Sequence, residues 1–261
     1  MRSPACPNVP GGVVRHWPLQ ALWCALAMGL WHGTACEGAA DTIDGLAPAD
    51  PIPAPAGRVV WRDEFRQAGE ERWEVRPGSQ WEWMELKDEE AGKVRHVYAL
   101  TEIGPPGRIR APMAWSLVRD LEVGEVVLTA HGHVATARSV RGRDLILFFG
   151  YQGPEQFYYV HFSAENSAVH NVVMRVNGAD REKLPHLVQP VPRLLSDGFH
   201  TIRIWHQPDT GDIIAWCDDM EVPIMHARDE ERLFRSGRVG IGSFDDRGWF
   251  DWFEVKVPAS Q

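Results

Sequence analysis

Apolar and polar residues alternate over most of the chain from Arg58 onward. For example, Ile202 and Ile204 would share one face of a strand, and Arg203 and Trp205 the other. A period of two is typical of a half-buried β-strand, because successive side chains point to opposite faces. No stretch of about twelve residues or more has a helical period. The predicted strands are 59–65, 79–86, 95–101, 114–119, 123–136, 144–151, 157–164, 171–177, 199–206, 212–217, 221–225, 238–243 and 249–257.

Turn residues separate these strands. Typical pairs are Gly153-Pro154, Asn177-Gly178 and Arg247-Gly248. Many short strands without intervening helices favour a sandwich or barrel over an α/β fold. We find no internal repeat, which argues against a propeller or solenoid. The pattern therefore predicts an all-β fold made of two antiparallel sheets.

Two segments resemble a known superfamily. The first is the opening segment, Trp61-Arg62-Asp63-Glu64-Phe65. The second is the closing segment, which runs from Gly240-Ile241-Gly242-Ser243-Phe244 to the WFDWFEV of 249–255. They resemble strands of concanavalin A-like and laminin G-like jelly rolls. The resemblance spans about 59–257, and within the superfamily the chain is similar to exported 3-keto-disaccharide hydrolase-like domains. It implies a jelly-roll sandwich, and carbohydrate as the partner, but such motifs specify architecture better than chemistry.

The N-terminus has the composition of a secretory signal peptide. Arg2 and Arg15 precede an apolar stretch at 19–31, which is short for a membrane span. We therefore expect a signal peptide at 1–36, no transmembrane segment after its removal, and a periplasmic or extracellular location. A lipid anchor at Cys36 is an alternative.

The remaining chain divides into two parts. Residues 37–57 are rich in Ala, Pro, Gly and Asp and predict a flexible tether. Residues 58–258 have a length that suits one large sandwich domain. Cys217 is the one cysteine of that predicted domain, and its apolar neighbours indicate a core residue rather than a nucleophile. A disulfide framework is not expected.

The chain is acidic, with 36 Asp and Glu against 27 Lys and Arg and a net charge of −9. Such a surface repels nucleic-acid phosphates and anionic lipids. Nucleic acid is therefore not expected as a partner.

Two successive predicted strands carry an unusual set of polar side chains. Tyr159 and His161 share a face of the first, and Asn171 and Arg175 share a face of the second. If the two faces coincide, they form a platform on which sugar rings stack and hydroxyls find planar donors and acceptors. The residues expected to bind the ligand are Tyr159, His161, Asn171, Arg175, Asn177, Arg203 and Trp205, with Asp180 and Arg181 at the rim.

A glycan-processing enzyme, a hydrolase or lyase acting on a disaccharide, is an alternative. His161 or His170 would then act as the base. The E-x-D-x-x-E strand motif that supplies paired carboxylates in laminarinase-type hydrolases is absent from the sequence, which weakens this alternative.

A third alternative is a calcium-dependent adhesion module. Adjacent carboxylates at Asp245 and Asp246, in a predicted turn, offer hard oxygen ligands to Ca²⁺. Calcium is also what the laminin G-like resemblance implies. No other cofactor is expected.

Two further pairs of residues have competing interpretations. His131 and His133 would share a strand face. The pair is either a weak indication of a zinc site or part of a solvated surface. Trp81 and Trp83 also share a face, and a core stripe is favoured over an exposed stacking surface.

Overall fold

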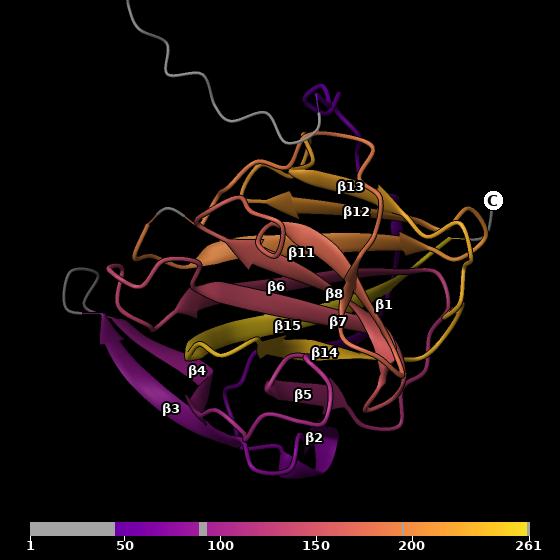
Figure 1. Ribbon diagram of the computed structural model, residues 1–261. Coiled ribbons are helices and arrows are strands. Elements are labelled where there is room, and N and C mark those ends of the chain that lie inside the picture. Colours follow the sequence, from indigo (N-terminus) through magenta and orange to yellow (C-terminus); the bar gives the residue numbers. More distant parts are fainter. Residues whose placement is uncertain (1–44, 89–92, 195, 260–261) are drawn as a thin grey trace, which may run out of the picture. The chain divides into compact units, whose positions relative to one another are not determined.

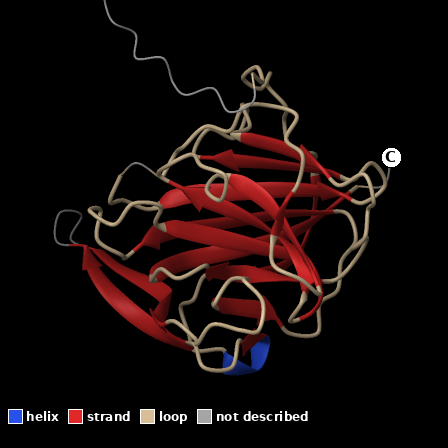
Figure 2. Cartoon of the chain, viewed as in Figure 1, coloured by secondary structure: helices blue, strands red, loops and turns tan. Residues whose placement is uncertain are grey.

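The computed structural model describes residues 45–88, 93–194 and 196–259 (Figure 1). Figure 2 shows that strands dominate. The one helical segment in these ranges is the 3₁₀ turn η1 (Glu70–Arg72), so none of the helices described is long and apolar enough to cross a membrane. Two antiparallel sheets of eight and seven strands form the sandwich that the alternation predicts, and the fold class is confirmed.

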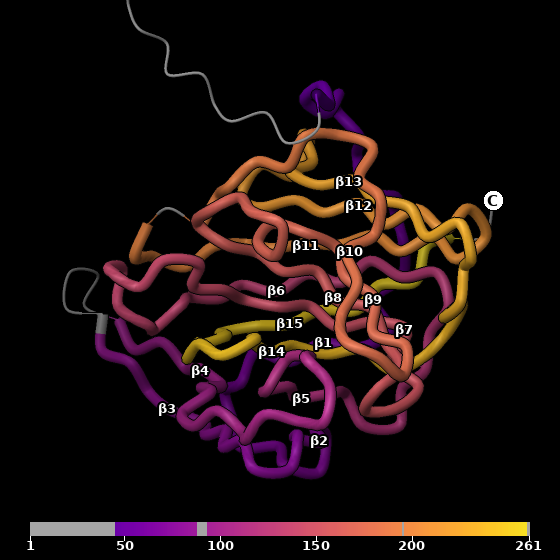
Figure 3. The backbone as a smooth tube through the Cα atoms, in the orientation of Figure 1, coloured from indigo at the N-terminus to yellow at the C-terminus, as the bar shows by residue number. Residues whose placement is uncertain are grey.

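The two sheets interleave strands that are distant in sequence. The order in the eight-stranded sheet is β13 (Met225–Arg228), β12 (Asp212–Cys217), β11 (His200–Gln207), β6 (Val126–Val134), β15 (Gly248–Pro258), β4 (Lys93–Glu102) and β3 (Gln80–Asp88), with β1 (Gly57–Asp63) paired to β15. The order in the seven-stranded sheet is β10 (Glu182–Lys183), β9 (Val172–Asn177), β8 (Gln156–Ser163), β7 (Asp144–Gly153), β14 (Arg238–Ser243), β5 (Ala114–Val118) and β2 (Trp73–Val75). The first and last strands of the domain therefore run side by side (Figure 3).

One predicted strand is misplaced. The prediction at 221–225 is wrong, because Asp219 Oδ1 accepts the backbone N–H groups of Glu221 and Val222 in a turn. The strand in this region, β13, begins at Met225. The short strands β2 and β10 have too few residues to show a period and were not predicted.

The core between the sheets is apolar and aromatic. Trp81 stacks on Tyr98 with ring centroids 4.8 Å apart, and the tilted ring of Trp83 lies 4.4 Å from the same tyrosine. Both tryptophans pack against the core, which confirms the core stripe. Cys217 is buried, as predicted, and burial raises the pKa of its thiol.

The outer face of the seven-stranded sheet is also buried. Phe148, Tyr159 and Met174 belong to a second apolar cluster. Ile109 and Ala111, from the loop between β4 and β5, pack against this cluster. Sequence alternation does not reveal such a cover, because the loop comes from elsewhere in the chain.

Part of the predicted tether contacts the sandwich. The N–H of Ile52 donates to the carbonyl of Glu221, and the Ile52 carbonyl accepts Trp216 Nε1 at 3.1 Å. These contacts cover the outer face of β12. Residues 1–44, with the predicted signal peptide and Cys36, lie outside the described residues.

Candidate functional site

The outer face of the eight-stranded sheet carries two adjoining hollows, which we call the aromatic groove. The first, of about 340 Å³, is lined by Glu64, Arg66, Val94, Arg95, His96, Asp251 and Trp252. The second, of about 530 Å³, is lined by Leu86, Lys87, Arg95, His131, Gly198, Phe199 and Trp249. Arg95 belongs to both linings, so the hollows are neighbours.

A β-bulge brings the tryptophans of the groove to one face. Trp249 pairs with His133 and Trp252 with His131, so that Asp251 is the extra residue on β15. In a regular strand, residues three apart point to opposite faces. The bulge adds one residue and restores Trp252 to the outer face, because bulges re-aim side chains in this way.

The rings of the groove contact one another. His133 stacks on Trp249 with centroids 4.9 Å apart, and His131 lies 5.3 Å from the ring of Phe199. His131 also stacks on Trp252 at 6.0 Å. Phe199, Trp249 and Trp252 are half-buried, which leaves part of each ring open to a ligand.

A charged network lies between these rings. The carboxylate of Asp251 forms an ion pair with Arg95 and accepts His131 Nδ1 at 2.7 Å. Because a carboxylate only accepts, Nδ1 carries the proton, and Nε2 of a neutral His131 remains an acceptor. The guanidinium of Arg95 in turn lies 4.3 Å from the centroid of Phe199. The network therefore fixes both the rings and the polar groups around them.

The predicted platform of Tyr159, His161, Asn171 and Arg175 is not formed. Tyr159 pairs with Met174 and His161 pairs with Val172, and directly paired residues share a face. Arg175 pairs with Tyr158 instead, on the opposite face. Tyr159 and His161 are also fully enclosed. The register between β8 and β9 differs by one residue from the one that the platform requires. A shift of one residue moves every side chain of a strand to the opposite face.

Arg175 instead belongs to a partly buried ion cluster. Its guanidinium binds Asp229 at 3.0 Å, Glu182 at 3.0 Å and Glu231 at 3.1 Å. Asp229 also accepts the hydroxyl of Tyr158. The side chain therefore holds loop and strand together.

Asn171 and Asn177 also lie away from the platform. Asn171 has a φ of +50°, which Asn tolerates better than most residues. Its amide binds the backbone of Ser163 on both sides, with Oδ1 accepting N–H at 2.9 Å and Nδ2 donating to the carbonyl at 3.1 Å. Asn177 is exposed at the end of β9.

The two predicted rim residues fasten the loop that covers the seven-stranded sheet. Asp180 accepts the backbone N–H of Arg110 at 2.8 Å. Arg181 donates to the hydroxyl of Tyr159 at 3.3 Å, and its guanidinium lies 3.9 Å from the ring centroid of Phe244.

Arg203 and Trp205 do share an exposed face, as the alternation predicts. They lie on the outer face of the eight-stranded sheet, where Arg203 binds Thr129 Oγ1 at 3.0 Å and Trp205 Nε1 binds Glu125 at 2.9 Å. Thr129 is two residues from His131 on β6, so this patch continues the face of the aromatic groove.

A second cluster joins the predicted calcium ligands to a residue that the sequence did not indicate. Carboxylate oxygens of Asp144, Asp245 and Asp246 lie within 4.8 Å of one another. Burial and the neighbouring Asp144 raise the pKa of Asp246 to about 7. The pKa of Asp144 is lowered by His161, whose Nε2 lies 3.1 Å away, against the effect of its own burial. Three carboxylates are ligands that Ca²⁺ prefers.

A cavity of about 670 Å³ opens at this cluster. Asp245, Asp246 and His170 line it, whereas His161 does not and is only 1% exposed. His170 accepts or donates a hydrogen bond at Ser167 Oγ, 3.1 Å away, and burial lowers its pKa. Of the two predicted bases, His170 alone therefore faces a space that a ligand could occupy.

No family model and no curated protein matches the chain. Several solved structures are similar. The carbohydrate binding module CBM66 from Bacillus subtilis is 12% identical with a TM-score of 0.44, over 69% of this chain and 96% of that one. A Lotus tetragonolobus seed lectin is 13% identical with a TM-score of 0.45, over 77% of this chain and 99% of that one. A β-1,3-glucanase from Mycobacterium marinum is 14% identical with a TM-score of 0.43, over 77% and 99%.

These neighbours are of the lectin and glucanase kinds that the sequence resemblance indicates. Likeness at this level says nothing about what the chain binds. The groove residues that the sequence did not indicate as candidates include Phe199, Trp249, Asp251 and Trp252. The available signal was the aromatic and acidic alternation of the last strand, but the bulge that gathers these side chains has no sequence signature.

Proposed function

We propose that the protein binds carbohydrate in the aromatic groove. The observation that carries this proposal is the set of three half-buried rings, Phe199, Trp249 and Trp252, held around the network of Asp251, Arg95 and His131. The apolar C–H face of a sugar stacks on such rings, and its hydroxyls bind planar donors and acceptors.

The size of the groove supports a small glycan. The larger hollow, of about 530 Å³, lies within the usual range of small-molecule sites, and the smaller one extends it. Lys87 and Arg95 supply donors, and Asp251 and the histidine Nε2 atoms supply acceptors. Because both charges are present, a neutral sugar fits better than a polyanion.

The groove also has the accessibility that the predicted platform lacks. Tyr159 is fully buried beneath the loop with Ile109 and Ala111, whereas Trp249 and Phe199 are half-buried on an outer face. Arg203 and Trp205 lie farther along the same face and form the proposed extension for a longer chain.

A calcium site is the second candidate function, in support of an adhesion module. The carboxylates of Asp144, Asp245 and Asp246 converge, and Asp245 and Asp246 line a cavity that a cation could enter. Calorimetry with CaCl₂ on the wild type and on Asp245→Asn would test it, with the exposed Asp209→Asn as control. Equal heats from all three proteins would refute the site.

Glycan processing receives less support. His161 is enclosed, and the acids around it belong to the cluster just described. Export through a signal peptide at 1–36 remains part of the proposal, because the sequence pattern alone supports it. N-terminal sequencing of the protein from its native host would test it.

A glycan microarray is the experiment that tests carbohydrate binding. The full chain and the Trp249→Ala/Trp252→Ala double variant would be compared at equal folded concentration. We expect the wild type to select a small set of glycans and the double variant to lose that selection. Identical profiles for both proteins would refute the groove as the binding site.

A further inference from the structure

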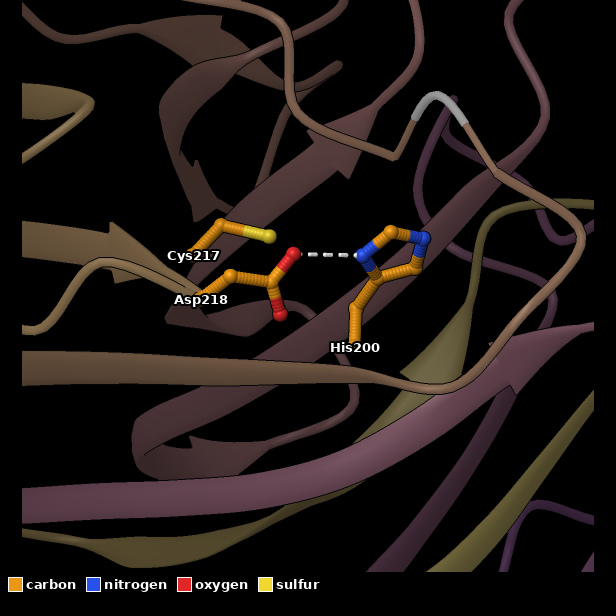
Figure 4. Close-up of side chains that lie close together, drawn as sticks. All are labelled: His200, Cys217 and Asp218. Carbon is orange, nitrogen blue, oxygen red and sulfur yellow. Dashed lines mark hydrogen bonds and ion pairs between the residues drawn. The ribbon is translucent and has the colours of Figure 1, made fainter.

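Three side chains near one end of the eight-stranded sheet form a hydrogen-bonded chain. Ser196 Oγ lies 2.9 Å from Nε2 of His200, and Nδ1 of the same ring lies 2.7 Å from Oδ2 of Asp218. Figure 4 shows the Asp218 carboxylate directed at the His200 ring. Ser196 is exposed, whereas the His200 side chain is only 8% exposed.

The direction of these hydrogen bonds follows from their chemistry. The ionised carboxylate of Asp218 only accepts, so Nδ1 of His200 carries a proton. In a neutral imidazole, Nε2 is then an acceptor, and the hydroxyl of Ser196 donates to it. Serine hydroxyl, imidazole and carboxylate in this order are the arrangement that activates a serine nucleophile.

The backbone holds this arrangement in place. Asp218 has a φ of +61°, an uncommon conformation for a residue other than glycine. This conformation turns the carboxylate back toward β11, where Oδ1 accepts the N–H of Thr201 at 2.9 Å. On the other side, the N–H of Gly198 donates to Ser196 Oγ at 3.1 Å, and Arg143 donates to the Ser196 carbonyl at 3.2 Å. Uncommon backbone conformations of this kind cluster at functional sites.

Cys217 lies beside His200 and Asp218, so a metal site is the competing interpretation of this cluster. The Cys217 side chain packs in the apolar core between the sheets and is only 1% exposed. Asp218 already binds His200 and Thr201. The geometry therefore favours a proton relay over metal coordination.

We infer that Ser196 is a nucleophile for acyl transfer, with small carboxylic esters as its class of substrate. Ser196 Oγ forms a bond to the acyl carbon while its proton moves to Nε2 of His200. The ester C–O bond then breaks, and the leaving alcohol takes that proton. Water attacks the acyl-serine by the same route, which releases the acid and restores the hydroxyl. Asp218 is a positioning residue that keeps His200 in the required tautomer.

This inference stands apart from carbohydrate binding, although the two sites are neighbours. Gly198, whose N–H binds Ser196 Oγ, also lines the larger hollow of the aromatic groove. The test uses small probes alone, so that failure of either proposal is seen separately.

Labelling with a fluorophosphonate tests the inference directly. The full chain would be treated with the probe, and the adduct located by peptide mass spectrometry. We expect a single adduct at Ser196, which Ser196→Ala removes and the matched Ser167→Ala retains. Ser167 also hydrogen-bonds a histidine, His170, but among the described residues no carboxylate hydrogen-bonds to that ring.

The relay itself is tested by rates. We expect His200→Gln to lower the labelling rate by about 100-fold or more, because the general base is lost. In p-nitrophenyl acetate hydrolysis, we expect Asp218→Asn to lower kcat with little change in KM, and Asp218→Glu to restore part of kcat. Asn tolerates the same backbone conformation, so the variant should fold. Circular dichroism would confirm folding of each variant.

Two results would overturn the inference. One is an unlabelled Ser196 in the folded wild type. The other is a folded His200→Gln variant that labels at the wild-type rate, which would mean that Ser196 is merely exposed.

Discussion

Nδ1 of His131 lies 2.7 Å from Oδ1 of Asp251, the extra residue of the bulge in β15. The same carboxylate binds Arg95 of β4, so one acidic side chain ties three neighbouring strands together on the outer face of the sheet. It is only 11% exposed, and its partners contact Phe199 and Trp252. The bulge therefore gathers both the aromatic rings and the charge that holds them.

Replacement of this carboxylate should destabilise the fold. In Asp251→Asn the Arg95 guanidinium loses its ionic partner in a partly buried place, and we expect the free energy of unfolding to fall by about 1–3 kcal/mol. Urea denaturation would measure it. The control is Glu85→Gln, since Glu85 is mostly exposed and lies 3.7 Å from His96, and it should change little. Equal stabilities of both variants would contradict the prediction.

Removal of a groove tryptophan should weaken glycan binding. We expect Trp249→Ala or Trp252→Ala to raise Kd by about tenfold or more, because ring stacking and burial of apolar surface are lost. Titration calorimetry with a glycan from the array would measure it. Trp205→Ala is the matched control, since Trp205 lies on the same face but outside the groove. If Trp205→Ala alone weakened the binding of a short glycan, the site would lie elsewhere.

Arg175 should affect stability rather than binding. Arg175→Ala leaves Asp229, with a side chain only 4% exposed, without its cation, and we expect a loss of about 3–5 kcal/mol. Thermal unfolding would measure the loss, with the exposed Arg108→Ala as control. Glycan affinity of the folded fraction should be unchanged. A stable Arg175→Ala protein that no longer binds glycan would restore Arg175 as a ligand residue.

Asp246 should make the wild type less stable as the pH rises. Its pKa of about 7 in the fold exceeds the ordinary value of 3.8, so the folded state holds the proton more tightly. The stabilisation is complete below about pH 4 and is lost as the pH rises through about 7. Between pH 5 and 8, we expect the free energy of unfolding of Asp246→Asn to rise relative to that of the wild type by roughly 2–4 kcal/mol. The measurement is made with a chelator and without calcium. A constant difference across that range would contradict this.

His206 should change stability with pH in the opposite direction. Burial lowers its pKa to about 4 from 6.5, so the folded state binds its proton less well than the unfolded chain does. The stabilisation is present above about pH 6.5 and is lost as the pH falls toward 4. We expect His206→Phe, which keeps a ring beside Phe149, to show a flatter loss of stability between pH 6.5 and 4.5. An unchanged slope would show that His206 does not titrate in this range.

The sequence reveals the strands of this domain far better than it reveals the site. Alternation locates β11, in which every second residue is buried. Short apolar runs between turn residues locate β7 and β12, which are buried on both faces. The relative register of β8 and β9 depends on the turn and on packing against Ile109 and Ala111, so Tyr159 and Arg175 were placed on one face in error. The period of two itself was right.

The bulge and the acid cluster were hidden for a related reason. An extra residue at Asp251 leaves the composition of β15 unchanged while it shifts Trp252 to the other face. Asp144 meets Asp245 and Asp246 only because β7 and β14 are neighbours in the sheet, although about a hundred residues separate them. Contacts between distant segments of this kind have no local signal.

The indole N–H signals of the folded protein test carbohydrate binding in the groove most directly. In ¹⁵N-labelled protein, assigned with single Trp→Phe variants, a glycan selected on the array would be added in steps. We expect the Nε1 cross-peaks of Trp249 and Trp252 to move with one common Kd, and those of the buried Trp73 and Trp216 to stay. Saturable binding that leaves the signals of Trp249 and Trp252 in place would contradict the proposal.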